Sequence, residues 1–152
     1  MNRIEKGSLL VLAIIVAFNI FFGLGSIPLL DPDEPVYAET AREMIQFNDY
    51  LSPRIYNEYW FDKPPMYYWL VAGAMHVFGD GEFAARFPAA LMAFLTVIML
   101  YCSITRLFNE RAGFWSALVL ATSVQFFYLG KAAVTDTCLL YTSDAADEAR
   151  SV

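Results

Sequence analysis

The chain has 152 residues, of which 58% are hydrophobic, 16% aromatic and only 17% charged, a composition too apolar for an ordinary soluble domain. The formal net charge is -6 and no basic tract offers a footprint for nucleic acid, so a nucleic-acid partner is excluded. Two cysteines, Cys102 and Cys138, are too few to predict a disulfide framework or a cysteine metal site.

The chain opens with a short basic segment followed by a long apolar run. Residues 8–30 can cross a hydrocarbon core, which takes about 20 helical residues, and Asn19 is their one strongly polar member. Because no convincing cleavage site follows, we predict a retained signal anchor. Arg3 and Lys6 precede the run and predict a cytoplasmic N-terminus.

An acidic stretch, residues 31–35, follows this first span. Carboxylates at the mouth of a span are costly unless they contact water, a cation or a substrate, so the stretch predicts a site at the membrane surface. Asp33 and Glu34 precede a helical pattern over residues 36–46 and can cap its positive end. A carboxylate here can also accept a proton from an incoming hydroxyl or orient a bound cation. The local sequence leaves both roles open.

The aromatic segment 59–65 holds the next pair of polar residues. Asp62 can cap a helix begun by Pro64 and Pro65. Lys63 can snorkel between aromatic rings at the lipid boundary, or it can hold the phosphate of a lipid-linked substrate as a compact charge. Both interpretations of Lys63 stay open.

Residues 84–107 and 112–130 are the second and third predicted spans. The turn between them is basic and therefore predicted to be cytoplasmic. The N-terminus and this turn can lie on the same side of the membrane only if residues 64–79 do not cross it. We therefore predict that 64–79 is a helix along the outer surface, with the aromatic cluster 67–69 in the interface, although a tilted crossing stays open. Residues 31–83 then form an outer loop.

Asp136 lies at the outer end of the third span. An acid there is a functional-site candidate, with Lys131 as one partner, and an ordinary loop acid is the competing interpretation. His76 and Cys102 are predicted to be packing residues. The topology places the polar candidates on one outer face: Asp33, Glu34, Asp62, Lys63 and Asp136.

The end of the chain differs in character from the rest. Residues 138–148 read like the in-frame translation of a transposase-type sequencing-library adapter, and its index and constant region would account for 149–152. We predict that residues 1–137 are the N-terminal part of a longer membrane domain and that 138–152 are an artefact. A natural polar tail is the other interpretation.

Three motifs in order carry a resemblance over nearly all of residues 1–137. They are Asp33-Glu34-x-x-Tyr37-Ala38-Glu39-x-Ala41-Arg42-Glu43-Met44, Phe61-Asp62-Lys63-Pro64-Pro65-x-x-Tyr68-Trp69 and Ala133-Val134-Thr135-Asp136. The chain resembles polytopic GT-C type glycosyltransferases akin to protein O-mannosyltransferases, and among them the bacterial lipid A aminoarabinose transferases. The resemblance implies further spans beyond Asp136.

The resemblance implies an all-α integral membrane fold, a GT-C type multi-span helical bundle with two juxtamembrane helices in the first outer loop. It implies a bacterial inner-membrane enzyme, among membrane lipids, that moves a sugar from a polyprenyl-phosphate donor to a lipid A-like or other lipid or glycan acceptor on the periplasmic side. A divalent cation is the one cofactor left open.

Site residues are carried over from the resemblance by position. Asp33 matches the acid expected to act as the base for a hydroxyl acceptor, and Glu34 and Asp136 are further catalytic acids. Lys63 matches the residue expected to contact the donor phosphate. Asp62 binds substrate beside it, where aminoarabinose transferases usually have a longer Glu.

Two other function classes compete with the transferase. An ion or solute transporter segment needs acids inside its spans, and residues 9–30 and 88–101 contain none. A non-catalytic membrane scaffold would make a pairing of Asp33 with Lys63 incidental. Binding of undecaprenyl phosphate by the full-length protein would discriminate the three, and we expect the fragment alone to be inactive.

Overall fold

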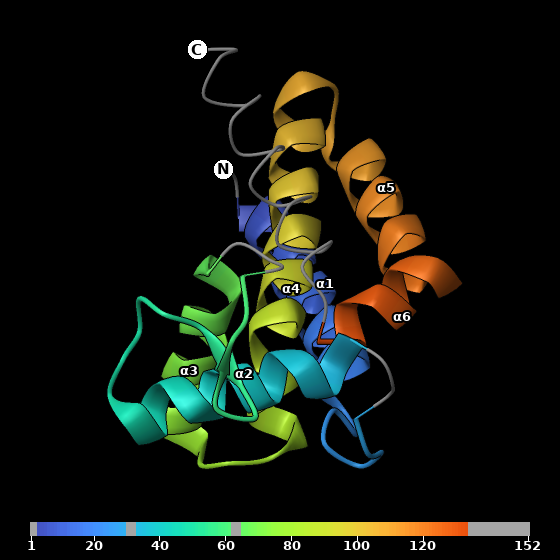
Figure 1. Ribbon diagram of the computed structural model, residues 1–152. Coiled ribbons are helices and arrows are strands. Elements are labelled where there is room, and N and C mark those ends of the chain that lie inside the picture. The colour runs from blue at the N-terminus through green and yellow to red at the C-terminus, as the bar shows by residue number, and fades with distance from the viewer. Residues whose placement is uncertain (1–2, 30–32, 62–64, 134–152) are drawn as a thin grey trace.

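The computed structural model describes residues 3–29, 33–61 and 65–133. Within these ranges the chain folds into helices and one small β-hairpin, as Figure 1 shows. In chain order the elements are α1 (Arg3–Phe21), α2 (Asp33–Phe47), β1 (Arg54–Ile55), β2 (Glu58–Tyr59), α3 (Met66–Phe78), α4 (Glu82–Leu107), α5 (Glu110–Thr122) and α6 (Val124–Lys131).

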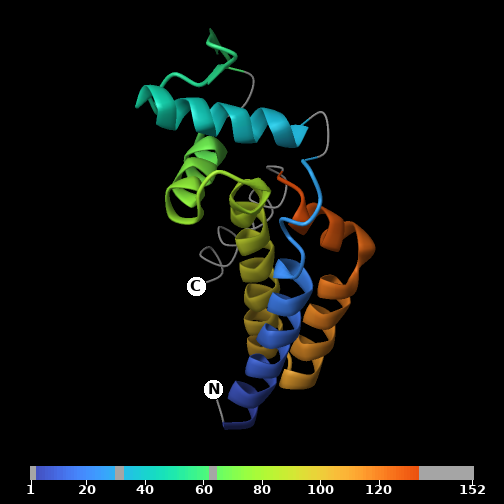
Figure 2. The same ribbon diagram turned by 90° about the horizontal axis from the view of Figure 1, so that it is seen from below.

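The helices are arranged as a lengthwise bundle with a second layer across one end (Figure 2). α1, α4 and α5 run beside one another and contact each other. α2 lies across the end of this bundle at which α1 ends and α4 begins, and α3 packs against both α2 and α4. α6 lies at the same end, against α4 and α1. The predicted outer-loop helices therefore gather at one end of the bundle.

Within the described residues, α4 alone is long and apolar enough to cross a membrane as a single helix. Its 26 residues extend about 39 Å at 1.5 Å per residue, more than a hydrocarbon core of about 30 Å. α5 and α6 qualify only as a pair bent by 65°. Ser123 makes this break, because its side chain accepts a hydrogen bond from the Phe126 amide (3.3 Å) and so caps α6. The span predicted over 112–130 is thus two helices.

α1 is shorter than the predicted span 8–30, because it ends at Phe21. The chain turns through residues 22–27, where Gly23 adopts a φ of 69°. A Cβ at Gly25 would lie 3.1 Å from Phe83 Cβ, so this turn packs closely on the start of α4. The composition stays apolar through the turn, and hydropathy alone therefore does not reveal where the helix ends.

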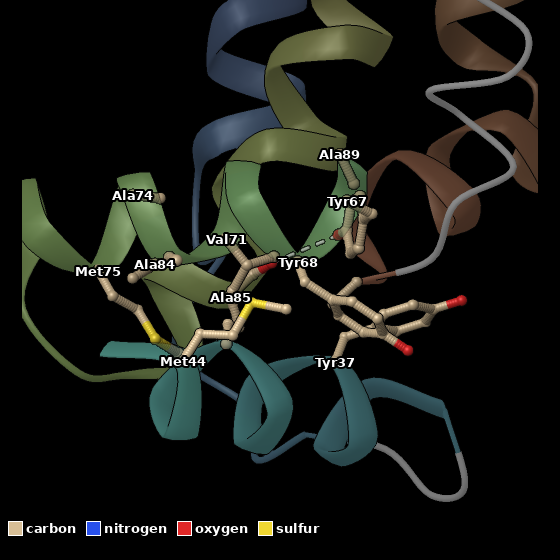
Figure 3. Close-up of a cluster of buried hydrophobic side chains, with 13 residues drawn as sticks. Tyr37, Met44, Tyr67, Tyr68, Val71, Ala74, Met75, Ala84, Ala85 and Ala89 are labelled. Atoms are coloured by element: carbon tan, nitrogen blue, oxygen red, sulfur yellow. Dashed lines mark hydrogen bonds between the residues drawn. The ribbon is translucent and has the colours of Figure 1, made fainter. Parts of the chain in front are cut away.

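One buried cluster joins α2, α3 and α4 (Figure 3). Tyr67 and Tyr68 are 1% and 0% exposed, and Tyr37 of α2 packs edge-on against Tyr67 with ring centroids 4.9 Å apart. This corrects the prediction that residues 67–69 form an interfacial cluster. Only Trp69 keeps an exposed surface, at 44%, because α2 covers the two tyrosines.

A second buried cluster joins α1, α4, α5 and α6. Cys102 packs against it, as predicted. The hydroxyls of Ser8 and Tyr101 lie 2.7 Å apart and tie α1 to α4 within this cluster. His76, predicted to be a packing residue, is instead exposed, and its Nε2 lies 3.0 Å from the hydroxyl of Tyr50.

Candidate functional site

The described part of the site is a buried ion pair between Arg86 of α4 and Glu34 of α2. Arg86 Nε donates to Glu34 Oε1 at 3.0 Å, and Arg86 Nη2 donates to Glu34 Oε2 at 2.7 Å. Both residues are about 95% buried, with exposures of 5% and 3%. A fork of two parallel hydrogen bonds fixes both the distance and the orientation of the carboxylate. We call this pair and its backbone partners the Arg86 clasp.

The remaining N–H groups of Arg86 hold the turn that follows α1. Arg86 Nη1 donates to the carbonyl oxygens of Leu24 (3.0 Å) and Ile27 (2.7 Å), and Nη2 donates to that of Pro28 (3.0 Å). A guanidinium has five N–H donors, so every donor of Arg86 has an acceptor. The side chain therefore satisfies three carbonyls of an irregular segment as well as the buried carboxylate.

Glu34 extends the clasp to the chain that follows α6. The backbone amide of Ala133 donates to Glu34 Oε1 at 2.6 Å, and Ala133 is fully buried. The start of α2, the start of α4, the turn after α1 and the chain after α6 thus meet at one point. Removal of one partner of such a buried pair strongly destabilises a protein, by about 3–5 kcal/mol, because the other charge is left uncompensated.

The structure describes two of the five predicted site residues. Asp33 is the first residue of α2, directly before Glu34, and its side chain lies outside the described residues. Asp62, Lys63 and Asp136 also lie outside them. Glu34 is placed in the clasp. The roles predicted for all five stay predictions.

A structured loop leads toward Asp62 and Lys63. Glu43 of α2, 6% exposed, accepts the backbone amide of Asn57 in the hairpin turn. Arg54 donates to Asp49 Oδ2 at 3.1 Å, and its guanidinium lies over the rings of Phe47 and Tyr59, 5.1 and 4.8 Å from their centroids. Side chains at the end of α2 therefore hold the hairpin against that helix.

Asp49 is the acidic anchor of this loop. Its carboxylate accepts the amides of Ser52 and Leu51, each at 3.2 Å, in addition to Arg54. The hydrogen bond from the Ser52 amide, with those from Leu51 and the charge of Arg54, lowers the pKa of Asp49 below its usual 3.8. The loop is thus held by a carboxylate that stays ionised at neutral pH.

A small cavity of about 160 Å³ lies beside the clasp. Its lining is mostly apolar and includes Leu24, Ile27 and Phe127, with Lys131 at one side. Lys131 Nζ donates to the carbonyl oxygen of Phe22 at 2.8 Å and lies 4.4 Å from the centroid of the Phe127 ring. The pairing of Lys131 with Asp136 stays a prediction, because Asp136 is not among the described residues.

The described residues contain no group of three or more His, Cys, Asp or Glu side chains that could hold a metal ion. The side chains of Asp33, Asp62 and Asp136 lie outside the described residues.

Arg86 is the site residue that sequence reasoning missed. In the sequence it is only a charge near the start of the second predicted span. The available signal is the residue type itself, because a guanidinium in an apolar helix is seldom buried without a partner. Its partner could not be read from the sequence, since Glu34 lies 52 positions away.

Residues 62–146 match the family model described as dolichyl-phosphate-mannose-protein mannosyltransferase. The chain belongs to this family. The family predicted from three sequence motifs is thereby confirmed. The matched region includes Asp62, Lys63 and Asp136. It also runs past Thr137, the predicted end of the natural sequence, and that boundary stays a prediction.

Individual members of the mannosyltransferase family resemble the chain over most of its length. The chain is 33% identical over 136 residues to the undecaprenyl phosphate-alpha-4-amino-4-deoxy-L-arabinose arabinosyl transferase of Yersinia enterocolitica. The aligned region covers 88% of this chain and 24% of the relative. A second such transferase, from Pseudomonas fluorescens, is 39% identical over 97 residues, or 63% of this chain and 18% of the relative. The chain spans about a quarter of the length of the curated relatives it matches.

Solved structures give the same assignment. Two crystal structures of ArnT from Cupriavidus metallidurans, one apo and one bound to undecaprenyl phosphate, match with a TM-score of 0.84 and 27% identity. Each match covers 91% of this chain and 26% of the ArnT chain. The predicted membrane-protein class and GT-C type helical fold are confirmed.

Proposed function

We propose that the protein carrying this chain is a glycosyltransferase that moves a sugar from a polyprenyl-phosphate donor to an acceptor in the cell envelope. The observation that carries the proposal is the match of 91% of the chain to ArnT, including a structure bound to undecaprenyl phosphate. Membership of the mannosyltransferase family supports the same reaction class. A lipid A-like molecule is the acceptor that the sequence resemblance implies.

The reaction breaks the bond between the anomeric carbon and the phosphate oxygen of the donor. The polyprenyl phosphate leaves with the electron pair, and Lys63 stabilises the negative charge on its phosphate, with Asp62 beside it. An acceptor oxygen forms the new bond to the anomeric carbon. Asp33 takes the proton if the acceptor is a hydroxyl, and it only orients the acceptor if the acceptor is a phosphate. Asp136 is a further acid of the same site.

The reaction is placed on the periplasmic face of the bacterial inner membrane. The basic residues at the start of α1, at the end of α4 and at the start of α5 favour a cytoplasmic position for this end of the bundle. The opposite end of the bundle, where α2 lies across it, then faces the periplasm. Asp33 begins α2 at that end, as Figure 2 shows for the helix.

The test measures sugar transfer from polyprenyl phosphate by the full-length protein that carries this chain. Asp33→Asn and Lys63→Ala should each abolish transfer without lowering the amount of protein in the membrane. Matched controls are Asp80→Asn, which changes an exposed acid, and Arg111→Ala, which removes an exposed cation of α5. Normal transfer by Asp33→Asn or Lys63→Ala would contradict the role given to that residue, and no transfer by the unchanged protein would contradict the proposal.

A further inference from the structure

We propose that Arg86 is a positioning residue of the transferase, which fixes the start of α2, where Asp33 lies, against the turn after α1 and the chain after α6. The proposal rests on the proposed function, because positioning matters only if Asp33 belongs to a reaction site. It gives Glu34 a role as well. Glu34 binds both Arg86 and the Ala133 amide, and so holds α2 in a fixed position relative to α4 and to the chain after α6. It does not exchange a proton with the substrate.

The geometry of Glu34 supports this role. Its Oε1 accepts Arg86 Nε and the Ala133 amide, and its Oε2 accepts Arg86 Nη2. Three charge-assisted or short hydrogen bonds, one at 2.6 Å, hold the ionised carboxylate in a single orientation. A carboxylate engaged in this way is poorly suited to accept a proton from a substrate. The adjacent residue, Asp33, begins the same helical turn, so its backbone position is fixed together with that of Glu34.

The choice of arginine also supports positioning. The three carbonyls of Leu24, Ile27 and Pro28 belong to an irregular segment, where no helix supplies their donors. Only a planar guanidinium offers enough donors in fixed directions to satisfy them and still bind a carboxylate by two hydrogen bonds. Lysine has three donors at a single nitrogen and cannot do both.

Stability alone does not require this arrangement. A buried ion pair can often be replaced by apolar side chains of similar volume without loss of stability, so its role is better sought in a defined conformation. Packing already joins the same elements, since Ala85 and Ala89 of α4 are fully buried in the cluster that contains Tyr37 of α2. Apolar packing alone would let α2 and α4 shift along one another. The directional hydrogen bonds of the Arg86 clasp fix their relative position.

The experiment uses the full-length protein carrying this chain, in detergent or proteoliposomes, with three variants. Arg86→Lys keeps the charge but removes the fork of donors. Glu34→Gln keeps the shape of the side chain and removes its charge, and it serves if Arg86→Lys does not fold. The charge exchange Glu34→Arg with Arg86→Glu restores an ion pair but cannot restore the three hydrogen bonds to carbonyls, because a carboxylate does not donate. Arg111→Lys is the matched control at an exposed arginine.

At equal membrane abundance, Arg86→Lys and Glu34→Gln should lower kcat about 10- to 100-fold, while KM for the donor changes less than twofold. The charge exchange should remain as slow as the single variants, and Arg111→Lys should match the unchanged protein. Recovery of kcat by the charge exchange would overturn the proposal, because an ion pair alone would then suffice. Unchanged kcat in both single variants would overturn it as well.

Amide hydrogen exchange separates this proposal from the proposed function. Arg86→Lys should raise exchange in residues 24–28, at the start of α2 and at Ala133, and leave α5 unchanged. If the unchanged protein transfers no sugar, the proposed function fails, while the exchange data still decide whether Arg86 positions these segments. Unchanged exchange in all three segments would overturn the positioning role.

Discussion

The backbone amide of Asn57 donates to both carboxylate oxygens of Glu43, at 3.2 Å to each. Asn57 and the preceding Tyr56 have φ angles of 66° and 53°, as the two central residues of a two-residue hairpin turn require. A buried carboxylate of α2 therefore holds the tip of the hairpin. The strand that leaves this tip leads, within a few residues, to Asp62 and Lys63.

Glu43→Ala should release the hairpin from α2. A hydrogen bond to a charged group contributes about 1.5–3 kcal/mol, so exchange of the amides in residues 54–59 should rise about tenfold or more. Hydrogen exchange resolved by mass spectrometry measures this directly. Glu58→Gln is the control, because Glu58 is an exposed acid of the same hairpin. Equal protection of residues 54–59 in Glu43→Ala and the unchanged protein would contradict the proposed anchor.

The contact between α4 and α5 leaves no room for a side chain at Gly113. A Cβ at this position would overlap Thr105 Oγ1 and lie 3.0 Å from the carbonyl oxygen of Tyr101. Gly113→Ala should therefore destabilise the protein by about 1–3 kcal/mol, the usual cost of overpacking. Gly73→Ala is the matched control, since Gly73 lies in α3 with nothing within 4 Å of a Cβ.

At Gly73 the same substitution should stabilise the protein by about 0.5–1 kcal/mol, because alanine loses less backbone entropy in a helix. Thermal unfolding in detergent should thus shift in opposite directions for the two variants. An unchanged or raised unfolding temperature in Gly113→Ala would show that α4 and α5 do not approach as closely as Gly113 indicates.

Asp49 makes the hairpin loop sensitive to acid. Its folded-state pKa is lowered below 3.8, first by the Ser52 amide, so its stabilising effect is complete above the pKa of the unfolded chain. The effect is lost as the pH falls through the lower folded-state pKa. Hydrogen exchange of the loop, corrected for its intrinsic pH dependence, should therefore lose protection below about pH 4. Asp49→Asn should remove this loss, whereas Asp80→Asn should keep it.

Local pattern predicted the helices whose ends coincide with a change of composition. α3 begins after two prolines and ends before Gly79, and α4 ends before a basic turn, so both agree with the sequence within a few residues. The end of α1 and the bend at Ser123 were missed, because both lie within apolar sequence. Hydropathy measures transfer into lipid and contains no information about where an apolar chain turns.

The sequence predicted only part of the candidate site, and the reason differs from the one for the helix ends. Motif resemblance selected Asp33 and Glu34 as a pair, and the environment of the Glu34 side chain depends on α4. Arg86 binds one of them, and this contact joins residues 52 positions apart. The same holds for Tyr67 and Tyr68, whose burial depends on α2. A single sequence reveals the types of these residues but not their partners.

Lys131 provides a last prediction at the junction of α1 and α6. Its ammonium donates to the carbonyl oxygen of Phe22, just beyond the C-terminus of α1, and lies over the ring of Phe127. A cation at a helix C-terminus contributes about 0.3–1 kcal/mol and a cation–π contact at a partly exposed site about 0.5–1 kcal/mol. Lys131→Met should therefore lower the free energy of unfolding by about 1–2 kcal/mol.

A double-mutant cycle separates the two contacts. Lys131→Met, Phe127→Leu and the double variant should give a coupling energy of about 0.5–1 kcal/mol, because only the cation–π contact joins these two side chains. Lys131→Arg keeps the charge and should retain most of the stability. A coupling energy near zero would assign the effect of Lys131 to the α1 carbonyl alone, and the orientation of α6 would then not depend on Phe127.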